Sequence, residues 1–295
     1  MNYSTPSLRI LTLSAILVAG IPIHSNPTRW LQRPGGRIAW TLHGDHGPLV
    51  VCMPGMGDLR QGYDAFADSL VRRGWKVAVM DLRGHGQSDT GFGDVTSRAI
   101  SLDALALADS LDTGKVVFLG NSYTGASAVW AATDRPGKVS AIVLVDPFVR
   151  EIPPTFLQKL TMAVGLVRPW GPSLWGSYYR SLFVDHPPLD LDARVQRVVA
   201  NLKERGRFET LNSMLRTPVA PCEARLPQVR VPALVVMGAK DPDFPDPKAE
   251  ATTVASRIHG STFLVPGAGH YPYAEQPGLV ATRIDAFVRA QVAAP

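Results

Sequence analysis

The sequence predicts an α/β fold, a mostly parallel sheet of eight strands covered by helices on both faces, with a helical cap inserted before the penultimate strand. Apolar runs alternate along the chain with segments of helical spacing. The runs are hydrophobic throughout, as strands buried on both faces require. One stretch, residues 147–231, is too long for an ordinary crossover and indicates the cap.

The first two predicted strands, Thr28–Gln32 and Arg37–His43, flank Pro34-Gly35-Gly36 and indicate an antiparallel hairpin. Six further apolar runs bounded by turn residues predict buried strands: Pro48–Met53, Lys76–Asp81, Lys115–Gly120, Ser140–Asp146, Ala233–Gly238 and Ser261–Val265. The spacing of apolar residues predicts helices after these runs, at Tyr63–Arg73, Ser97–Leu111, Tyr123–Thr133, Lys248–Ile258 and Leu279–Ala290.

The predicted cap contains two stretches with helical spacing, Thr155–Arg168 and Asp192–Leu215. We interpret the segment between them, which is rich in proline and aromatic residues, as a link. The apolar side chains of the cap either line an acyl pocket or, as we favour, pack against the rest of the protein. The predicted domains are therefore a core of residues 28–146 and 232–295, a cap of residues 147–231 and an N-terminal extension of residues 1–27.

Composition is that of an ordinary globular protein, with 45% hydrophobic and 19% charged residues. The formal net charge is +5, and residues 147–226 hold eleven basic and seven acidic side chains. These basic residues are spread along predicted helices and form no Lys/Arg run, so we expect no nucleic-acid partner. Cys52 and Cys222 lack the spacing of metal ligands, and we expect no metal.

The N-terminal region contains an uncharged, largely apolar run, Ile10–Ile23. It is shorter than the roughly 20 residues of a membrane span, so we predict no stable span. Its length is typical of a signal peptide, with Val18-Ala19-Gly20 as the cleavage region. The alternatives are a buried or amphipathic helix and a start codon placed too far upstream. Export and a cytoplasmic location are equally open.

Ser122 stands where an apolar strand meets a helix of small residues. The stretch Val116–Ala128 resembles the nucleophile elbow of the α/β-hydrolase family, whose pattern is small-x-nucleophile-x-small. Gly120 meets the steric requirement before the serine, whereas Thr124 replaces the usual glycine after it, with Gly125 one place later. The resemblance implies that Ser122 is a nucleophile; the alternative is a serine that caps an ordinary helix.

A second motif, Pro54-Gly55-Met56-Gly57, is similar to the oxyanion-hole loop of the same family, which usually reads His-Gly-x-Gly. The resemblance implies that the backbone amides of Met56 and Tyr123 stabilise the negative oxygen of acyl transfer. Replacing histidine by proline leaves these two amides intact. The alternative is a glycine-rich loop kept only for its turn.

In this family the acid and then the histidine follow the serine along the chain. Asp241 lies just past a predicted strand, with Asp243 and Asp146 as alternatives, and His270 lies in a glycine-rich loop after the last strand. The resemblance implies that His270 is the general base and Asp241 its orienting carboxylate. His85 lies in a turn that the family uses structurally, and the other five histidines have no supporting context.

The resemblance implies a serine hydrolase that forms an acyl-enzyme on a small-molecule acyl substrate and needs no cofactor. Carboxylesterases, lactonases, carbon–carbon bond hydrolases and cofactor-free perhydrolases share the same triad, so the substrate and the oligomeric state stay open. A serine nucleophile disfavours relatives that resemble haloalkane dehalogenases and epoxide hydrolases, which use aspartate. A ligand-binding protein without catalysis is the alternative class, because fold does not determine function. A membrane-tethered interaction protein would rest on Ile10–Ile23 alone.

Overall fold

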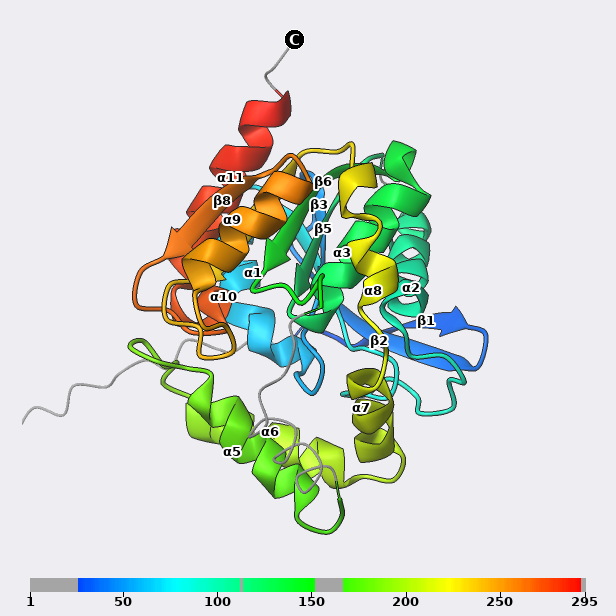
Figure 1. Cartoon of the computed structure of the whole chain (residues 1–295). Helices are drawn as coiled ribbons and strands as arrows, with labels where there is room; N and C mark the ends of the chain where they lie inside the picture. Colours follow the sequence, from blue (N-terminus) through cyan, green and yellow to red (C-terminus); the bar gives the residue numbers. More distant parts are fainter. Residues whose placement is uncertain (1–25, 112–113, 152–166, 293–295) are drawn as a thin grey trace, which may run out of the picture.

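The computed structural model describes residues 26–111, 114–151 and 167–292 (Figure 1). The predicted leader Ile10–Ile23 and most of the predicted helix Thr155–Arg168 lie outside these residues. The described part forms one sheet of eight strands in the order β1-β2-β4-β3-β5-β6-β7-β8. The strands are β1 (Arg29–Arg33), β2 (Gly36–His43), β3 (Leu49–Met53), β4 (Lys76–Met80), β5 (Val116–Asn121), β6 (Val139–Val145), β7 (Ala233–Gly238) and β8 (Ser261–Val265).

The predicted pairing is confirmed, because β1 and β2 form an antiparallel hairpin and β3 to β8 pair in parallel. The strand β2 also runs antiparallel to β4. In the central strand β3, Val50 and Cys52 point into one hydrophobic core, and Val51 and Met53 point into the other. Successive side chains of a strand point to opposite faces, so each face needs its own cover.

Helices cover both faces of the sheet, as predicted (Figure 1). One core is closed by α2 (Ser97–Ser110), α3 (Tyr123–Asp134) and α9 (Pro247–Arg257). The other core is closed by α1 (Asp64–Val71) and α11 (Pro277–Val292). Short helical elements complete the core at η1 (Arg60–Tyr63), η2 (Pro136–Lys138) and α10 (Pro272–Glu275).

The inserted segment contributes the helices α5, α6 and α7, which lie together beyond one end of the sheet (Figure 1). Their bounds, with those of the short elements that lead back to the sheet, are α5 (Gly171–Ser181), α6 (Leu191–Lys203), α7 (Arg207–Leu215), α8 (Ala220–Glu223) and η3 (Leu226–Gln228). The boundaries predicted between core and cap stay a prediction.

Two predictions within this segment were wrong. The presumed link is the helix α5, whose Pro172 lies in the first turn, where a missing N–H costs no helical hydrogen bond. The presumed single helix Asp192–Leu215 is two helices, because Gly206 has a φ of +86° and this left-handed conformation ends one helix before the next begins.

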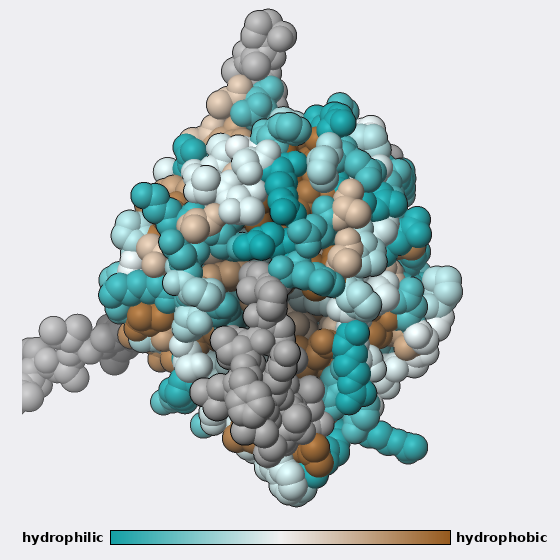
Figure 2. Space-filling model, in the orientation of Figure 1, coloured by the Kyte–Doolittle hydropathy of each residue, from teal (hydrophilic) through white to brown (hydrophobic). Residues whose placement is uncertain are grey.

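Across the described ranges, no helix is both long and apolar enough to cross a bilayer. In Figure 2 hydrophilic residues make up most of the visible described face, and hydrophobic residues lie among them in small separate areas. This pattern is normal for a protein surface, where single apolar side chains need no partner.

Substitution of Asp103, a residue of α2 in a buried ion pair, tests how much this pair stabilises the core. Asp103 is fully buried and accepts hydrogen bonds from Arg83 Nε (2.6 Å) and Arg33 Nε (2.8 Å). Asp103→Ala leaves two guanidinium groups without their anion, so we expect the free energy of unfolding in urea to fall by about 3–5 kcal/mol. Asp109 also lies on α2, and Asp109→Ala breaks exposed pairs with Arg135 and Lys138, which should cost under about 1 kcal/mol. Equal losses would contradict this account.

Candidate active site

Ser122 occupies a sharp bend between β5 and α3. Its backbone has φ +56° and ψ −122°, a conformation that residues other than glycine rarely adopt. The bend is held because the Ser122 N–H donates to Val145 O (2.9 Å) and the Ser122 carbonyl accepts from the N–H groups of Gly125 (3.0 Å) and Phe148 (3.1 Å). The Ser122 side chain makes no capping hydrogen bond to α3, which argues against an ordinary helix cap.

The two residues that flank this bend explain its sequence. A Cβ at Gly120 would lie only 2.0 Å from the carbonyl oxygen of Thr124, so no side chain fits there. Thr124, which departs from the family pattern, is buried, and its hydroxyl lies 2.7 Å from Met53 O and 2.9 Å from Asn121 O. The threonine therefore ties the bend to the end of β3.

His270 and Asp241 are joined directly. Nδ1 of His270 lies 2.7 Å from Oδ2 of Asp241, and both side chains are buried. The alternative acid Asp243 is farther away, with its Oδ2 at 3.7 Å from the same nitrogen. Burial opposes a charged imidazolium, but the charge and hydrogen bond of Asp241, together with the charge of Asp243, raise the pKa of His270 to about 9.

The side chain of Asn121 connects the serine bend to the histidine loop. Its amide nitrogen donates to Val145 O (3.1 Å) and to the carbonyl of His270 (3.2 Å). The residue before Ser122 thus holds the backbone of His270. The hydrogen bonds of the described residues include none between the Ser122 hydroxyl and the His270 ring. A contact between these two groups during catalysis is therefore a proposal.

The predicted oxyanion donors lie on the two segments that meet at Ser122. A Cβ at Gly55, the residue before Met56, would lie 3.2 Å from the Cβ of Ser122, so this loop passes against the serine. Tyr123 is the first residue of α3, where the helix provides no acceptor for its amide N–H. Their role as donors stays a prediction.

Behind this loop, the buried carboxylate of Asp58 connects three parts of the chain. It accepts hydrogen bonds from the hydroxyl of Tyr179 in α5 (3.0 Å) and from that of Tyr273 in α10 (2.9 Å). Tyr273 also stacks on Tyr63, with ring centroids 4.0 Å apart. Burial raises the pKa of Asp58, and these hydrogen bonds partly offset that cost.

The helix α5 reaches over the candidate site. A Cβ at Gly57 would lie 2.3 Å from Nε1 of Trp175, so the indole lies against the predicted oxyanion loop. The Tyr178 hydroxyl donates to Oδ2 of Asp243 (2.7 Å). The sequence marked Trp175 and Tyr178 only as apolar residues of the cap and did not predict these contacts, because each contact joins positions far apart in the chain.

The histidine loop is also held from α5 and α10. The N–H of His270 donates to Leu182 O (2.9 Å), just after α5. Glu275 accepts from the N–H of Gly269 (2.7 Å) and of Val184 (3.2 Å), so one carboxylate bridges the loop and the segment after α5. Glu275 is a further residue that the sequence did not reveal.

His85 lies apart from this cluster of contacts. Its Nδ1 lies 2.9 Å from Arg83 O, and burial lowers the pKa of His85 to about 4, so the ring is neutral at ordinary pH. The next residue, Gly86, exchanges two hydrogen bonds with Asn201 of α6 (3.0 and 2.9 Å). This turn is therefore where α6 packs onto the core, in agreement with the structural interpretation of His85.

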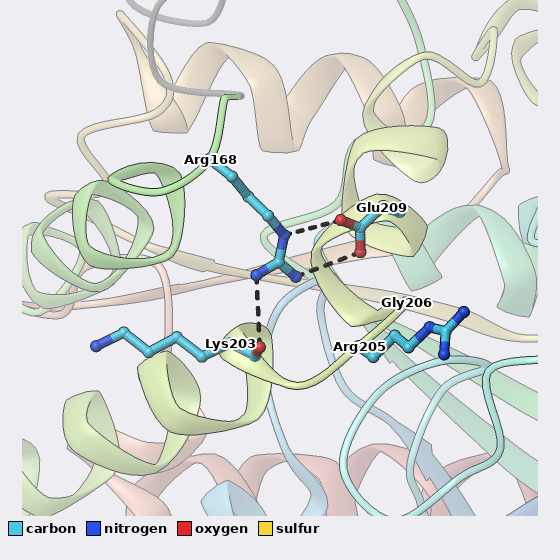
Figure 3. A pocket seen from close by; sticks show the side chains of 5 residues that line it. All are labelled: Arg168, Lys203, Arg205, Gly206 and Glu209. Carbon is cyan, nitrogen blue, oxygen red and sulfur yellow. Dashed lines mark hydrogen bonds and ion pairs between the residues drawn. The ribbon is translucent and has the colours of Figure 1, made fainter.

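A pocket of about 480 Å³ that the described residues form is not at this site. It is an open surface pocket between α6 and α7, lined by Arg168, Lys203, Arg205, Gly206 and Glu209 (Figure 3). Arg168 pairs with Glu209 (2.8 Å) and donates to carbonyls at the end of α6. Lys203 and Arg205 point away from it (Figure 3). We assign Arg168 to capping the helix.

The sheet order, the serine bend and the Asp241–His270 pair define an α/β hydrolase. More narrowly, the chain belongs to the family described as serine aminopeptidase, S33, whose model matches residues 44–277. The protein is therefore a hydrolase of this fold.

Several characterised proteins are similar to this chain. It is 33% identical over 258 residues to the polyketide synthase ThaQ of Burkholderia thailandensis, covering 81% of this chain but only 12% of that protein. It is 24% identical to 3-oxoadipate enol-lactonase 2 of Acinetobacter baylyi, over 72% of this chain and 78% of the enzyme. An esterase structure from Thermogutta terrifontis superposes with a TM-score of 0.75 at 24% identity, covering 90% and 99% of the two chains, and shows the common fold.

Gly120→Ala tests the steric origin of the serine bend. The added methyl would overlap the carbonyl oxygen of Thr124, so we expect the free energy of unfolding to fall by about 1–3 kcal/mol or more. Gly137→Ala is the matched control, because no atom lies within 4 Å of its Cβ, and it should change stability by under about 0.5 kcal/mol. Urea denaturation of both variants measures the difference; a Gly120→Ala protein as stable as the control would contradict the assignment.

Proposed function

We propose that this protein is a serine hydrolase that cleaves carboxylic esters through an acyl-enzyme, with Ser122 as nucleophile, His270 as general base and Asp241 as orienting acid. The observation that carries the proposal is the buried hydrogen bond of 2.7 Å between Asp241 and His270, on a loop tied by Asn121 to the strained serine bend. Strained backbone at a non-glycine residue is typical of functional sites.

The reaction proceeds in two halves. His270 accepts the proton of the Ser122 hydroxyl as its oxygen attacks the ester carbonyl, and the amides of Met56 and Tyr123 stabilise the resulting oxyanion. The tetrahedral intermediate collapses to the acyl-enzyme, and His270 returns the proton to the departing alcohol. A water molecule activated by His270 then attacks the acyl-enzyme, which releases the acid and restores Ser122. The protein residues supply every proton transfer in this sequence.

Asp241 is preferred to Asp243 as the orienting acid for two reasons. Its oxygen is 1.0 Å closer to Nδ1 of His270, at 2.7 Å against 3.7 Å. The nearer oxygen of Asp243 also accepts the hydroxyl of Tyr178. Asp243 therefore acts on the histidine through its charge, while Asp241 holds the ring orientation.

The surroundings of His270 favour an uncharged acyl substrate. Phe148 and Phe244 stack with centroids 4.9 Å apart, and the Phe148 centroid lies 5.9 Å from that of His270. The charges next to the imidazole are the carboxylates of Asp241 and Asp243. A substrate with a carboxylate, such as the 3-oxoadipate lactone named for the Acinetobacter relative, would be repelled there. A neutral ester fits this apolar and acidic setting better.

Three buried arginines of the described chain already form ion pairs with carboxylates. The pairs are Arg60 with Asp81, Arg83 with Asp103 and Arg194 with Asp190. A buried guanidinium released from its partner would carry an uncompensated charge, so these side chains are poor candidates for binding an anionic substrate. This supports a neutral ester over a lactone that carries a carboxylate.

Ser122→Ala tests the nucleophile. We expect loss of labelling by a fluorophosphonate probe and a fall of about 10³-fold or more in the hydrolysis of short p-nitrophenyl esters, because the covalent route is removed. Ser127→Ala is the control, a buried serine in the helix α3 that follows Ser122; its hydroxyl has no partner among the described residues, and the variant should keep both activities. Labelling that persists in Ser122→Ala would refute the nucleophile; a wild-type protein that neither reacts nor hydrolyses would favour the ligand-binding alternative.

The pH dependence of kcat/KM tests the base. Only neutral His270 accepts a proton, so kcat/KM should rise through the alkaline range with a midpoint at about pH 9. Asp243→Asn removes a negative charge 3.7 Å from Nδ1, which lowers the pKa of His270 and should move this rise to lower pH. Asp185→Asn, an exposed acid paired with Lys240, should leave the profile in place. An unshifted profile in Asp243→Asn would contradict the electrostatic account.

A further inference from the structure

Asp146, at the end of β6, is a buried carboxyl group that the mechanism above does not use. It is fully buried, and its backbone φ of +44° is positive, as that of Ser122 is. One side-chain atom from each of Asp146, Asp241 and His270 lies within 4.8 Å of the other two. Oδ1 of Asp146 accepts the N–H of Gly238 (2.8 Å), which holds the side chain toward Asp241.

The second oxygen of Asp146 lacks a hydrogen-bond donor in the described part of the chain. Oδ2 is buried and has no partner there. A buried carboxylate oxygen without a donor is costly, and a second negative charge beside Asp241 adds repulsion. A proton on Oδ2 removes both costs, because the neutral O–H becomes a donor and Asp241 is the adjacent acceptor.

The charges that face Asp146 also favour this proton. Asp241 and Glu275 both repel a negative charge at Asp146, and Asp243 lies in the same cluster of acids around His270. His270, which has the opposite sign when protonated, is already hydrogen-bonded to Asp241. Burial, followed by the charge of Asp241, raises the pKa of Asp146 well above its ordinary value.

We propose that Asp146 is a neutral, protonated acid whose Oδ2–H donates a hydrogen bond to Asp241 and so positions that carboxylate against His270. The inference rests on the proposed function, because it assigns Asp241 the orienting role. Asp146 is a positioning residue that contacts no substrate. Asp146 and Asp241, sharing one proton, carry one negative charge between them, which keeps the imidazole less basic than two charges on this pair would.

The rival assignment is an ionised Asp146 that orients His270 in place of Asp241, and the two assignments differ in what an amide does. Asparagine at 146 offers an oxygen to Gly238 and a neutral N–H donor to Asp241, so it mimics a protonated acid but not a carboxylate. Alanine offers neither. The variants Asp146→Ala, Asp146→Asn and Asp241→Asn therefore form one series.

We expect Asp146→Ala to lower kcat/KM for a p-nitrophenyl ester by about tenfold or more, and Asp146→Asn to restore it to within about threefold of the wild type. Asp241→Asn should cost about 10⁴-fold, the scale of removing an orienting carboxylate. The alkaline midpoint of Asp146→Asn should match that of the wild type. A loss in Asp146→Asn as large as that in Asp241→Asn would overturn the proposal, because it would show that residue 146 needs a charge.

Infrared difference spectroscopy provides a readout that needs no turnover. The spectrum of the wild type minus that of Asp146→Asn at neutral pH should contain the C=O stretching band of a protonated carboxylic acid. A carboxylate band in its place would refute the proton on Asp146. A protein without esterase activity or fluorophosphonate labelling would refute the proposed function instead, and the spectrum would still decide the protonation state.

Discussion

The close approach of backbone segments at the carboxyl edge of the parallel sheet is the constraint on which the site depends. At Gly120 the chain passes so near Thr124 that a Cβ would lie 2.0 Å from its carbonyl oxygen, and at Gly238 a Cβ would lie 1.9 Å from Gly269 O. Parallel strands end at one edge of a sheet, so their loops must share that space. The same crowding holds Ser122 in a strained conformation beside the histidine loop.

Burying several carboxyl groups at this edge of the sheet has an electrostatic cost. Asp58, Asp146, Asp241 and Asp243 surround one imidazole in a buried region where charge is poorly solvated. The structure offsets that cost by hydrogen bonds from tyrosine hydroxyls and backbone amides to several of these oxygens. The proton that we propose on Asp146 lowers this cost further, because it replaces the repulsion between Asp146 and Asp241 by a hydrogen bond.

The inserted helices are part of the site and not only its cover. Tyr178 binds the loop that carries the acids, and the carbonyl of Leu182 holds the backbone of His270. Glu275 bridges the histidine loop and the segment after α5. A change that moves α5 therefore moves the catalytic loops of the proposed mechanism with it. The placement of His270 therefore depends on the inserted segment through these few hydrogen bonds.

Local sequence patterns were enough to predict the eight strands, most of the core helices and the position of Ser122, because these follow from hydrophobic runs and from small residues that the nearby backbone requires. The predictions for α5 and for the chain around Gly206 were wrong. In α5 a proline lies in the first turn of a helix, and at Gly206 a left-handed glycine separates two helices, and the hydrophobic pattern at both places is weak. Local patterns could not predict which acid contacts His270 or which residues of α5 contact the loops around it. Those contacts join positions distant in the chain, and their distances depend on how the loops pack, which no local pattern encodes.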